Sequence, residues 1–485
     1  MRPVQLVPAG VVLLALGAIA GAAQFASPAT PGPGHAAAAK QVVVTSAARA
    51  CPPAAGGGPG RVALIAGSSS APGSGQAQLA PLPLAGAQLR TLNPITQTEP
   101  GLLSLLTIPA GQTTSKKPAP VEQGWSVTAT GTLAQAMEAE EASGSGLASV
   151  RCGEPGSDLW FVGPGQQGGA AQVQLDLMNV DALPASVDVR IITDAGQLPA
   201  GPDTGITVPP HQTVTESLSS FAAGASVVAI EARTTTGRVV ADVSDGSSHG
   251  GTASWLPSTA EPSTQLVIPG VAPSGGTAGL YVVVPGSAGA RIAVTAITAQ
   301  GRHQPFGTQA IELPGDSASY VPLTPLGGTA ALELTANVPV TAGVLVPGSG
   351  LGAFTAATAP ISEQAIVAGN TTSSGLGVTV ALSAPAGQAR VRLTETATTP
   401  GATSSQVVTV QAGHTLIVPA ALPPGAKHGS AFAIVITPLA GSGPLYAARV
   451  ETHGQNTVAS IVPAVSALTT ITLPPVRDSY DAISP

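Results

Sequence analysis

The 485-residue sequence has little charge, few aromatic residues and only two cysteines. Charged residues make up 9% of the chain, and the net charge is −7 with four lysines and no basic run. Because phosphate binding depends on clustered Lys and Arg, this pattern argues against a nucleic-acid partner. Aromatic residues make up 3%, so hydrophobic cores must be filled by Val, Ala, Leu and Ile, which suits thin β-sandwiches better than large ligand cavities.

The sequence also lacks the short motifs that carry common catalytic or metal chemistry. It has no H-x-x-x-H pair and no G-x-x-x-x-G-K-[ST] loop, and its seven histidines are scattered. His211 and His414 occupy matching repeat positions, but the middle repeat has Asp316 there, which indicates a turn position that tolerates polar side chains. We therefore predict no catalytic, cofactor-binding or metal-binding residues.

Two acidic groups were the remaining candidates for chemistry. Thr132–Ala142 is the one segment that the sequence favours as a helix, and it carries Glu138, Glu140 and Glu141. Carboxylates at these spacings do not share one helix face, so we expect a solvated surface and no metal or acid–base site. Asp242 and its neighbour Asp245 lack the six to eight oxygens that calcium needs.

Glycine and proline, in contrast, are abundant. The chain has 59 Gly and 46 Pro, which excludes a helix-rich fold, while 44% hydrophobic residues and the absence of a Gly-X-Y period exclude a disordered or collagen-like chain. The length allows three or four domains.

A recurring pair of alternating segments organises the chain. In Ala225–Gly246, apolar residues alternate with polar ones on both sides of Thr234–Gly237, which predicts a β-hairpin. The same pattern recurs at 332–346 and 432–450, which gives repeats of about 100 residues. The repeats predict an all-β fold of tandem immunoglobulin-like β-sandwiches, with a β-propeller of two four-stranded blades per repeat as the alternative.

Other parts of the repeat can also be aligned. The repeats share an opening strand, at Leu159–Gly165, Gln265–Gly270 and Ala365–Asn370. They share a later Ala-x-Val-x-Val-like strand, at Ala185–Ile191, Ala290–Ala296 and Ala389–Glu395. They also share a strand-turn-strand, at Ile206–His211, Ile311–Asp316 and Val408–His414. Before the first repeat, strands are predicted at Arg61–Ala66, Leu102–Ile108 and Gly124–Thr130.

The N-terminus predicts export. Val4–Phe25 is apolar and long enough to span a bilayer of about 30 Å. Either it is an uncleaved anchor, or it is a signal peptide cleaved at one of its small-residue sites; a buried globular helix is the remaining alternative. Arg2 would stay in the cytoplasm by the positive-inside rule, which leaves the chain after about Ser27 outside, as a single-pass membrane protein or as a secreted one.

The two cysteines, Cys51 and Cys152, are most simply a disulfide in an exported chain. The alternatives are two free thiols or a lipid-modified cysteine. A disulfide between them would close a loop of about 100 residues, for which the chain-entropy model gives an upper figure of about 4–5 kcal/mol.

These observations predict a domain layout along the whole chain. The expected segments are a signal-anchor or signal peptide at 1–27, a Pro/Gly/Ala linker at 28–52, an N-terminal β-rich unit at 53–158, and sandwich repeats at 159–262, 263–361 and 362–485.

The count of strands predicts a closing contact. Thr469–Pro475 looks like an opening strand with no repeat after it, whereas the N-terminal unit has no clear opening strand of its own. Because an unpaired edge strand is an aggregation liability, we expect Thr470–Leu473 to pair with the N-terminal unit and close the chain into a compact ring.

The anchor, the linker, the strand-Pro-Gly pattern, the Ala-x-Val-x-Val and Val-Pro-Pro-x segments and the paired segments together resemble a family of actinobacterial exported proteins known only as a domain of unknown function. The resemblance covers most of the chain after about Pro53. It implies an extracytoplasmic, β-rich envelope protein and supplies no active-site residues.

We therefore expect a non-enzymatic cell-envelope protein that acts as a scaffold or binding surface for wall polymer or protein partners, without cofactors. The alternative is a cell-wall glycan-acting enzyme or a carbohydrate-binding module. An enzyme of that kind needs two carboxylates about 5–10 Å apart, and acidic residues are sparse in this chain.

Overall fold

The structure is a computed structural model. It describes residues 40–54, 60–67, 74–85, 95–99, 101, 103–108, 123–143, 148–170, 172–199, 205–246, 254–273, 278–323, 326–348, 352–372, 376–454 and 457–473. The chain divides into two compact bodies, one of residues 43–470 and one formed by the terminal segments 1–42 and 471–485. The predicted anchor Val4–Phe25 lies outside the described residues, and among those that are described no helix has the length and apolarity to cross a membrane.

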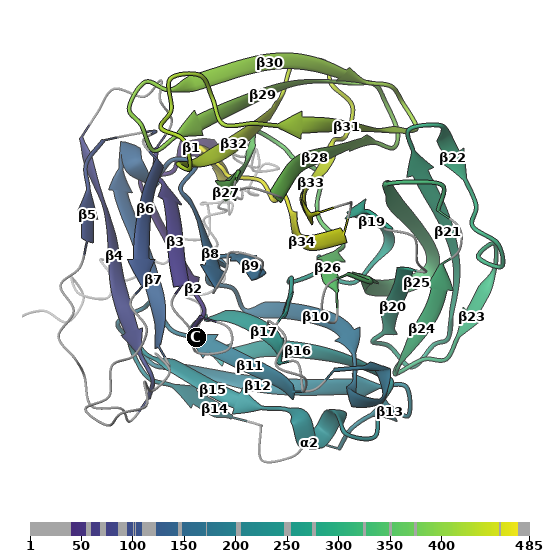
Figure 1. The fold of residues 1–485 in the computed structure, drawn as a ribbon. Coiled ribbons are helices and arrows are strands. Elements are labelled where there is room, and N and C mark those ends of the chain that lie inside the picture. Colours follow the sequence, from purple (N-terminus) through teal and green to yellow (C-terminus); the bar gives the residue numbers. More distant parts are fainter. Residues whose placement is uncertain are drawn as a thin grey trace, which may run out of the picture. The chain divides into compact units, whose positions relative to one another are not determined.

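The described residues of the larger body form four units with one strand order. In each unit the first, sixth, third and fourth strand positions form one antiparallel sheet, and the fifth, second, seventh and eighth form the other. The fourth position of units II and III holds two short strands. The all-β prediction is therefore confirmed, and Figure 1 shows the units in chain order from purple to yellow.

Unit I contains β2 (Ser46–Cys51), β3 (Gly60–Ile65), β4 (Gly75–Pro83), β5 (Ile95–Gln97), β6 (Leu103–Ile108), β7 (Gln123–Gly131), the 3-10 turn η2 (Thr132–Ala134), β8 (Glu138–Ser143) and β9 (Ala148–Arg151). Unit II contains β10 (Asp158–Pro164), η3 (Gln166–Gly168), β11 (Gln172–Met178), β12 (Ala185–Thr193), β13 (Gly196–Gln197), β14 (Ile206–Val208), β15 (Thr213–Ser217), α2 (Ser219–Ala222), β16 (Val227–Thr236), β17 (Val240–Gly246) and β18 (Ser254–Leu256).

Unit III contains β19 (Ser263–Val271), β20 (Ala278–Val284), β21 (Ala290–Thr298), β22 (Gly301–His303), β23 (Ile311–Leu313), β24 (Ser317–Leu323), β25 (Ala330–Val346) and β26 (Ala353–Ala356). Unit IV contains β27 (Ala365–Thr371), β28 (Leu376–Ala384), β29 (Ala389–Ala397), β30 (Thr403–Val410), β31 (His414–Ala420), β32 (Ala431–Pro438), β33 (Tyr446–His453) and β34 (Thr457–Pro463). β1 (Lys40–Val43) pairs with β35 (Thr470–Leu473), and all of both strands except Val43 and Thr470 belongs to the smaller body.

The two sheets of a unit face each other across one hydrophobic core. In unit II, Phe161 and Ile230 come from one sheet, Leu175 and Val243 come from the other, and all four belong to the same buried cluster. Each sheet combines strands that are not consecutive in the chain, whereas a propeller blade is a sheet of four consecutive strands, so within the described residues the propeller alternative is wrong.

The predicted hairpins are wrong, although their strands exist. β16 pairs with β10 and β12, whereas β17 pairs with β11 and β18, so the two strands lie in opposite sheets. In unit III a single strand, β25, runs through both sheets. Alternation gives each strand one apolar face, and those faces meet in the same core whether the strands pair side by side or face each other across it. The sequence pattern therefore could not distinguish the two arrangements.

The predicted helix Thr132–Ala142 is also wrong. Only the short turn η2 is helical, and β8 continues the segment as a strand between β3 and β9. Leu133 and Met137 are fully buried, so tertiary packing overrides the helical propensity of the Ala- and Glu-rich sequence.

The N-terminal region differs from the expected linker and strand count. β2 pairs with β7 in the way that β10 pairs with β16, so unit I has its own opening strand inside the segment predicted as linker. The sequence of β2, SAARAC, has no large apolar residue, which explains why the pattern was missed. The predicted pairing of Thr470–Leu473 with the N-terminal unit 53–158 is wrong, because β35 pairs with β1, which lies in the predicted linker.

Contacts within the larger body connect the units in a closed circuit. Each of units I to III shares a buried cluster with the next unit, through Ala50 with Met178, Val162 with Phe354, and Val271 with Ala448. Unit IV in turn packs on unit I, where Ile65 and Ile366 belong to one cluster. The last residues of the body add two backbone hydrogen bonds, from Val44 N–H to Thr469 O and from Ala136 N–H to Leu468 O, both 2.9 Å.

Candidate functional site

A cavity of about 360 Å³ lies where units I, II and IV meet. Its wall is formed by residues of β9, β10, β17, β18 and β34 and of the segments that follow β9, β18 and β34. Most of the lining is apolar, and the polar exceptions include Arg151, Glu154 and Asp242. A mainly apolar concavity with a few convergent polar groups is the usual form of a small-molecule site.

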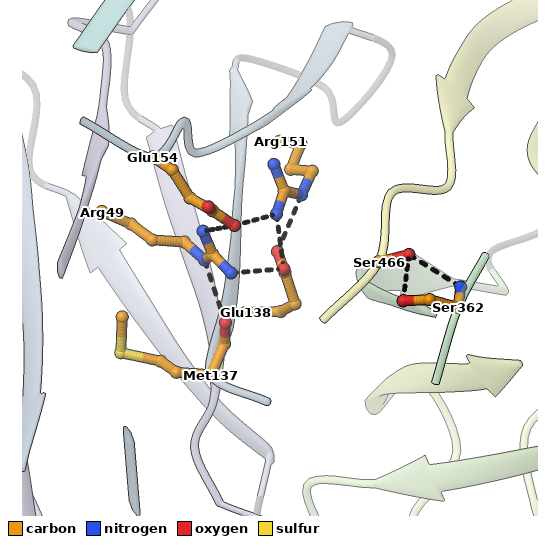
Figure 2. Close-up of polar contacts among 7 residues, drawn as sticks. All are labelled: Arg49, Met137, Glu138, Arg151, Glu154, Ser362 and Ser466. Atoms are coloured by element: carbon orange, nitrogen blue, oxygen red, sulfur yellow. Dashed lines mark hydrogen bonds and ion pairs between the residues drawn. The ribbon is translucent and has the colours of Figure 1, made fainter. Parts of the chain in front are cut away.

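Four charged side chains form a cluster at one side of this cavity, and Figure 2 shows their contacts. We call Arg49, Glu138, Arg151 and Glu154 the four-charge cluster. Glu138 accepts from Nη2 of Arg49 at 2.7 Å and from Nε and Nη2 of Arg151 at 2.9 and 2.6 Å. Glu154 contacts Nη1 of Arg49 at 2.5 Å and Nη2 of Arg151 at 3.2 Å. The two arginines thus share both carboxylates.

The cluster is fixed to the backbone of unit I. Nε of Arg49 donates to the carbonyl of Met137 at 2.9 Å, and the side chain of Glu138 is 1% exposed. The disulfide between Cys51 and Cys152 is formed, which confirms that prediction, and Cys152 directly follows Arg151. Cys51 ends β2 and Cys152 follows β9, so the disulfide connects the edges of the two sheets beside the cluster.

Burial and charge act in opposite directions on these carboxyl groups. Partial burial acts to raise the pKa of Glu154, but Arg49 and Arg151 outweigh it and lower that pKa to about 2. Burial dominates at Glu138 and raises its pKa despite the same two arginines. The pKa of Arg151 is raised because Glu138 and Glu154 outweigh the effect of burial. Glu154 is therefore a carboxylate at neutral pH, held by two cations.

A second carboxyl group in the cavity wall has the opposite property. Burial raises the pKa of Asp242 well above its ordinary value, with further contributions from Asp176 and Glu141. Its Oδ2 is buried without a hydrogen-bond partner among the described residues, and so is Nε1 of Trp255 in the same wall. A buried polar atom that lacks a partner costs about 1–3 kcal/mol of folding free energy.

A separate ion pair joins units IV and I behind the cavity. Nη1 of Arg449 on β33 donates to Oε1 of Glu140 on β8 at 2.5 Å, and the side chains are 0% and 2% exposed. Nη2 of Arg449 donates to Ser149 and Ser460, while Oε2 of Glu140 accepts the backbone N–H of Gly369 at 3.1 Å. Strands from opposite ends of the body are therefore joined through side chains that water does not reach.

The segment after β34 is tied to the start of unit IV. Ser466, which lines the cavity, accepts from the backbone N–H of Ser362 at 3.0 Å and lies 3.3 Å from its hydroxyl (Figure 2). This contact holds one wall of the cavity in place.

The predicted exposure of the acidic residues in 132–142 is wrong. Glu138, Glu140 and Glu141 were expected on a solvated surface, and all three are buried. The turn interpretation of the polar repeat positions agrees with the backbone, since φ is 53° at His211 and 50° at Asp316. In the last repeat Gly413 holds that position with φ 73°, and His414 lies one residue beyond it.

Sequence reasoning missed Arg49, Arg151, Arg449 and Trp255 altogether. One signal was available for two of them, because Arg49 and Arg151 are each the only charged residue in a strand of small or apolar residues, SAARAC and ASVR. In a chain with 9% charged residues, an isolated charge within an apolar strand favours a buried partner.

Comparisons with known proteins add one match. No curated protein and no solved structure matches the sequence. The model of DUF5719, a family of unknown function, matches residues 108–421, which covers parts of all four units. The chain belongs to this family of unknown function, DUF5719.

Proposed function

We propose that this protein is a non-enzymatic, extracytoplasmic cell-envelope protein, with its units serving as a scaffold or binding surface for wall polymer or protein partners. The observation that carries the proposal is the use of its buried charges. Arg449 and Glu140 bind each other between units, and the four-charge cluster satisfies itself within unit I. Charged side chains that bind each other in this way hold the units together and are occupied by structural contacts.

Finer parts of the proposal concern fold and location. Each unit would be an immunoglobulin-like β-sandwich, a reading supported by its paired antiparallel sheets and its length of about 100 residues. The chain would be exported and held in the membrane by Val4–Phe25, or secreted after cleavage, as in the actinobacterial family that the sequence resembles. The disulfide supports an oxidising location.

A protease-accessibility experiment tests the location. A C-terminally tagged chain should fractionate with membranes, keep its N-terminal peptide and lose the tag when intact cells are treated with protease. A soluble form that begins near Gln24 would replace the anchor by a signal peptide. A tag that survives in intact cells and is digested only after lysis would overturn the extracytoplasmic proposal.

One observation favours the alternative function, a cell-wall glycan-acting enzyme or carbohydrate-binding module. Glu154 and Asp242 line one cavity, and their pKa values are displaced in opposite directions, which is the pattern of an acid–base pair. The two arginines on Glu154 weigh against that role, because they lower the basicity of its carboxylate.

Sedimentation with purified cell-wall sacculi separates the two functions. A binding protein should co-sediment with the sacculi and release no soluble glycan. Release of reducing ends that disappears in Asp242→Asn would establish the enzyme instead. Failure to co-sediment, together with failure to enrich an envelope protein in cross-linked capture from intact cells, would refute the binding role.

A further inference from the structure

Nη1 of Arg151 is a hydrogen-bond donor that the four-charge cluster does not use. Its Nε and Nη2 make all of its hydrogen bonds to Glu138 and Glu154. Nη1 has no hydrogen-bond partner among the described residues, and Figure 2 shows it directed away from both carboxylates. A guanidinium keeps its charge at all relevant pH values and holds its donors in a rigid plane. Arg151 lines the cavity, and the contacts of Nε and Nη2 fix the plane of its guanidinium beside that wall.

The rest of the wall suits an apolar body. Val150 and Trp255 belong to one buried cluster, and Val240, Ile461 and Leu468 complete the apolar side of the lining. The volume of about 360 Å³ lies at the lower end of the range for small-molecule sites. The occupant must therefore be compact and mostly apolar.

The charges around the cavity favour an uncharged occupant. The four-charge cluster contains two guanidinium groups and two carboxyl groups, so its charges are already balanced within the cluster. A ligand anion would be desolvated beside the carboxylate of Glu154, and a ligand cation would be desolvated beside Arg151. Burial raises the pKa of Asp242 well above its ordinary value, which favours the neutral form of this carboxyl group.

From this geometry we propose that the cavity binds a compact, uncharged, mainly apolar molecule through a carbonyl oxygen that accepts a hydrogen bond from Nη1 of Arg151. A carbonyl oxygen is a strong neutral acceptor, and a hydrogen bond from a charged donor is stronger than one between neutral groups. This inference goes beyond the scaffold function and does not depend on it.

Binding would also connect parts of the chain that are distant in sequence. The wall combines β9 of unit I, β17 and β18 of unit II, and β34 of unit IV. A ligand that binds only the assembled wall stabilises that assembly by mass action. Saturation should therefore slow backbone hydrogen exchange in these strands and leave β21 and β29, which do not line the cavity, unchanged.

Three probes of similar size test the proposal on the full chain. Benzylacetone carries a ketone, hydrocinnamate carries a carboxylate, and butylbenzene carries no polar group. Binding is measured by isothermal titration and by saturation-transfer NMR at neutral pH. We expect benzylacetone to bind at least about tenfold more tightly than either of the other two, because it alone combines an acceptor with zero charge.

Two variants locate the site. Ser258→Trp fills the cavity from an exposed position on its wall and should abolish benzylacetone binding. Arg151→Lys keeps a positive charge for Glu138 and Glu154 but removes the planar Nη1 edge, and it should weaken binding about tenfold. If Arg151→Lys fails to fold, Ser258→Trp alone decides whether the cavity is the site, and the probe series decides the chemistry.

Four results would overturn the proposal. Absence of benzylacetone binding refutes the site, and binding that Ser258→Trp leaves unchanged places it elsewhere. Equal or tighter binding of hydrocinnamate refutes the charge argument, and equal binding of butylbenzene shows that the Arg151 edge contributes nothing.

Discussion

Replacing Arg449 by methionine tests whether the ion pair between units IV and I holds that junction together. Methionine keeps the length of the aliphatic part of the side chain and removes the guanidinium. Glu140 would then keep a single polar contact, from the backbone N–H of Gly369 at 3.1 Å, while remaining 2% exposed. Ser149 and Ser460 would also lose their bonds to the guanidinium.

The expected loss follows from the burial of the partner left behind. Removing one member of a buried ion pair costs about 3–5 kcal/mol, because the other charge stays desolvated. Glu451, 3.7 Å from Arg449, adds less to this loss, since its pKa of about 7 allows it to take up a proton. The double variant Arg449→Met with Glu140→Gln removes the stranded charge, so it should recover at least about 2 kcal/mol.

Native-state hydrogen exchange is the suitable assay, because a chain of several units does not unfold in one step. Protection should fall in β8 and β27 of Arg449→Met and return in the double variant. Arg291→Met is the matched control, since Arg291 and Glu312 form an exposed pair at 3.5 Å that contributes at most about 1 kcal/mol. If Arg449→Met changes exchange no more than Arg291→Met, or if the double variant is worse than the single one, the reasoning is wrong.

Three further outcomes are expected. Burial raises the pKa of Glu451 from 4.5 to about 7, so the folded state binds the extra proton between these values; stability should fall as pH rises through this window, and Glu451→Gln should remove that part of the dependence in thermal melts. Gly270→Ala should destabilise the chain by more than Gly307→Ala, because a Cβ at Gly270 would lie 2.4 Å from Ala448 whereas Gly307 meets nothing within 4 Å, and both have positive φ; equal melting temperatures would contradict this. Non-reducing peptide mapping should recover Cys51 linked to Cys152, and reduction should cost up to about 4–5 kcal/mol in urea unfolding of unit I; two free thiols in the protein isolated from its own cells would refute the disulfide.

Strand positions were predictable because they depend on local signals. Short apolar runs bounded by Gly and Pro correctly predict β3 and β10, and period-two alternation correctly predicts β12. The pairing of strands was not predictable in the same way. β16 and β17 follow each other closely and share an apolar core, yet they pair with different partners, and only long-range packing decides this.

The prediction that the acidic residues lie on a solvated surface failed for a related reason. The partner of Glu140, Arg449, is 309 residues away, whereas the nearer Arg151 binds Glu138. A single sequence offers no means of joining them. The disulfide was predictable because the chain has only two cysteines, so the pairing had no competitor.

The junction between units IV and I did leave one signal that the period-two analysis passed over. A strand with one solvated face alternates, whereas a strand buried on both faces reads as a continuous apolar run. β3 contains VALI, in which Val62 and Leu64 face the core of unit I while Ala63 and Ile65 face unit IV. β27 and β32 have the same character, with AIVA and AFAIVI. In an open array these second faces would expose an apolar patch. The sequences of β3, β27 and β32 therefore indicate, without reference to β35, that units I and IV cover each other's second faces.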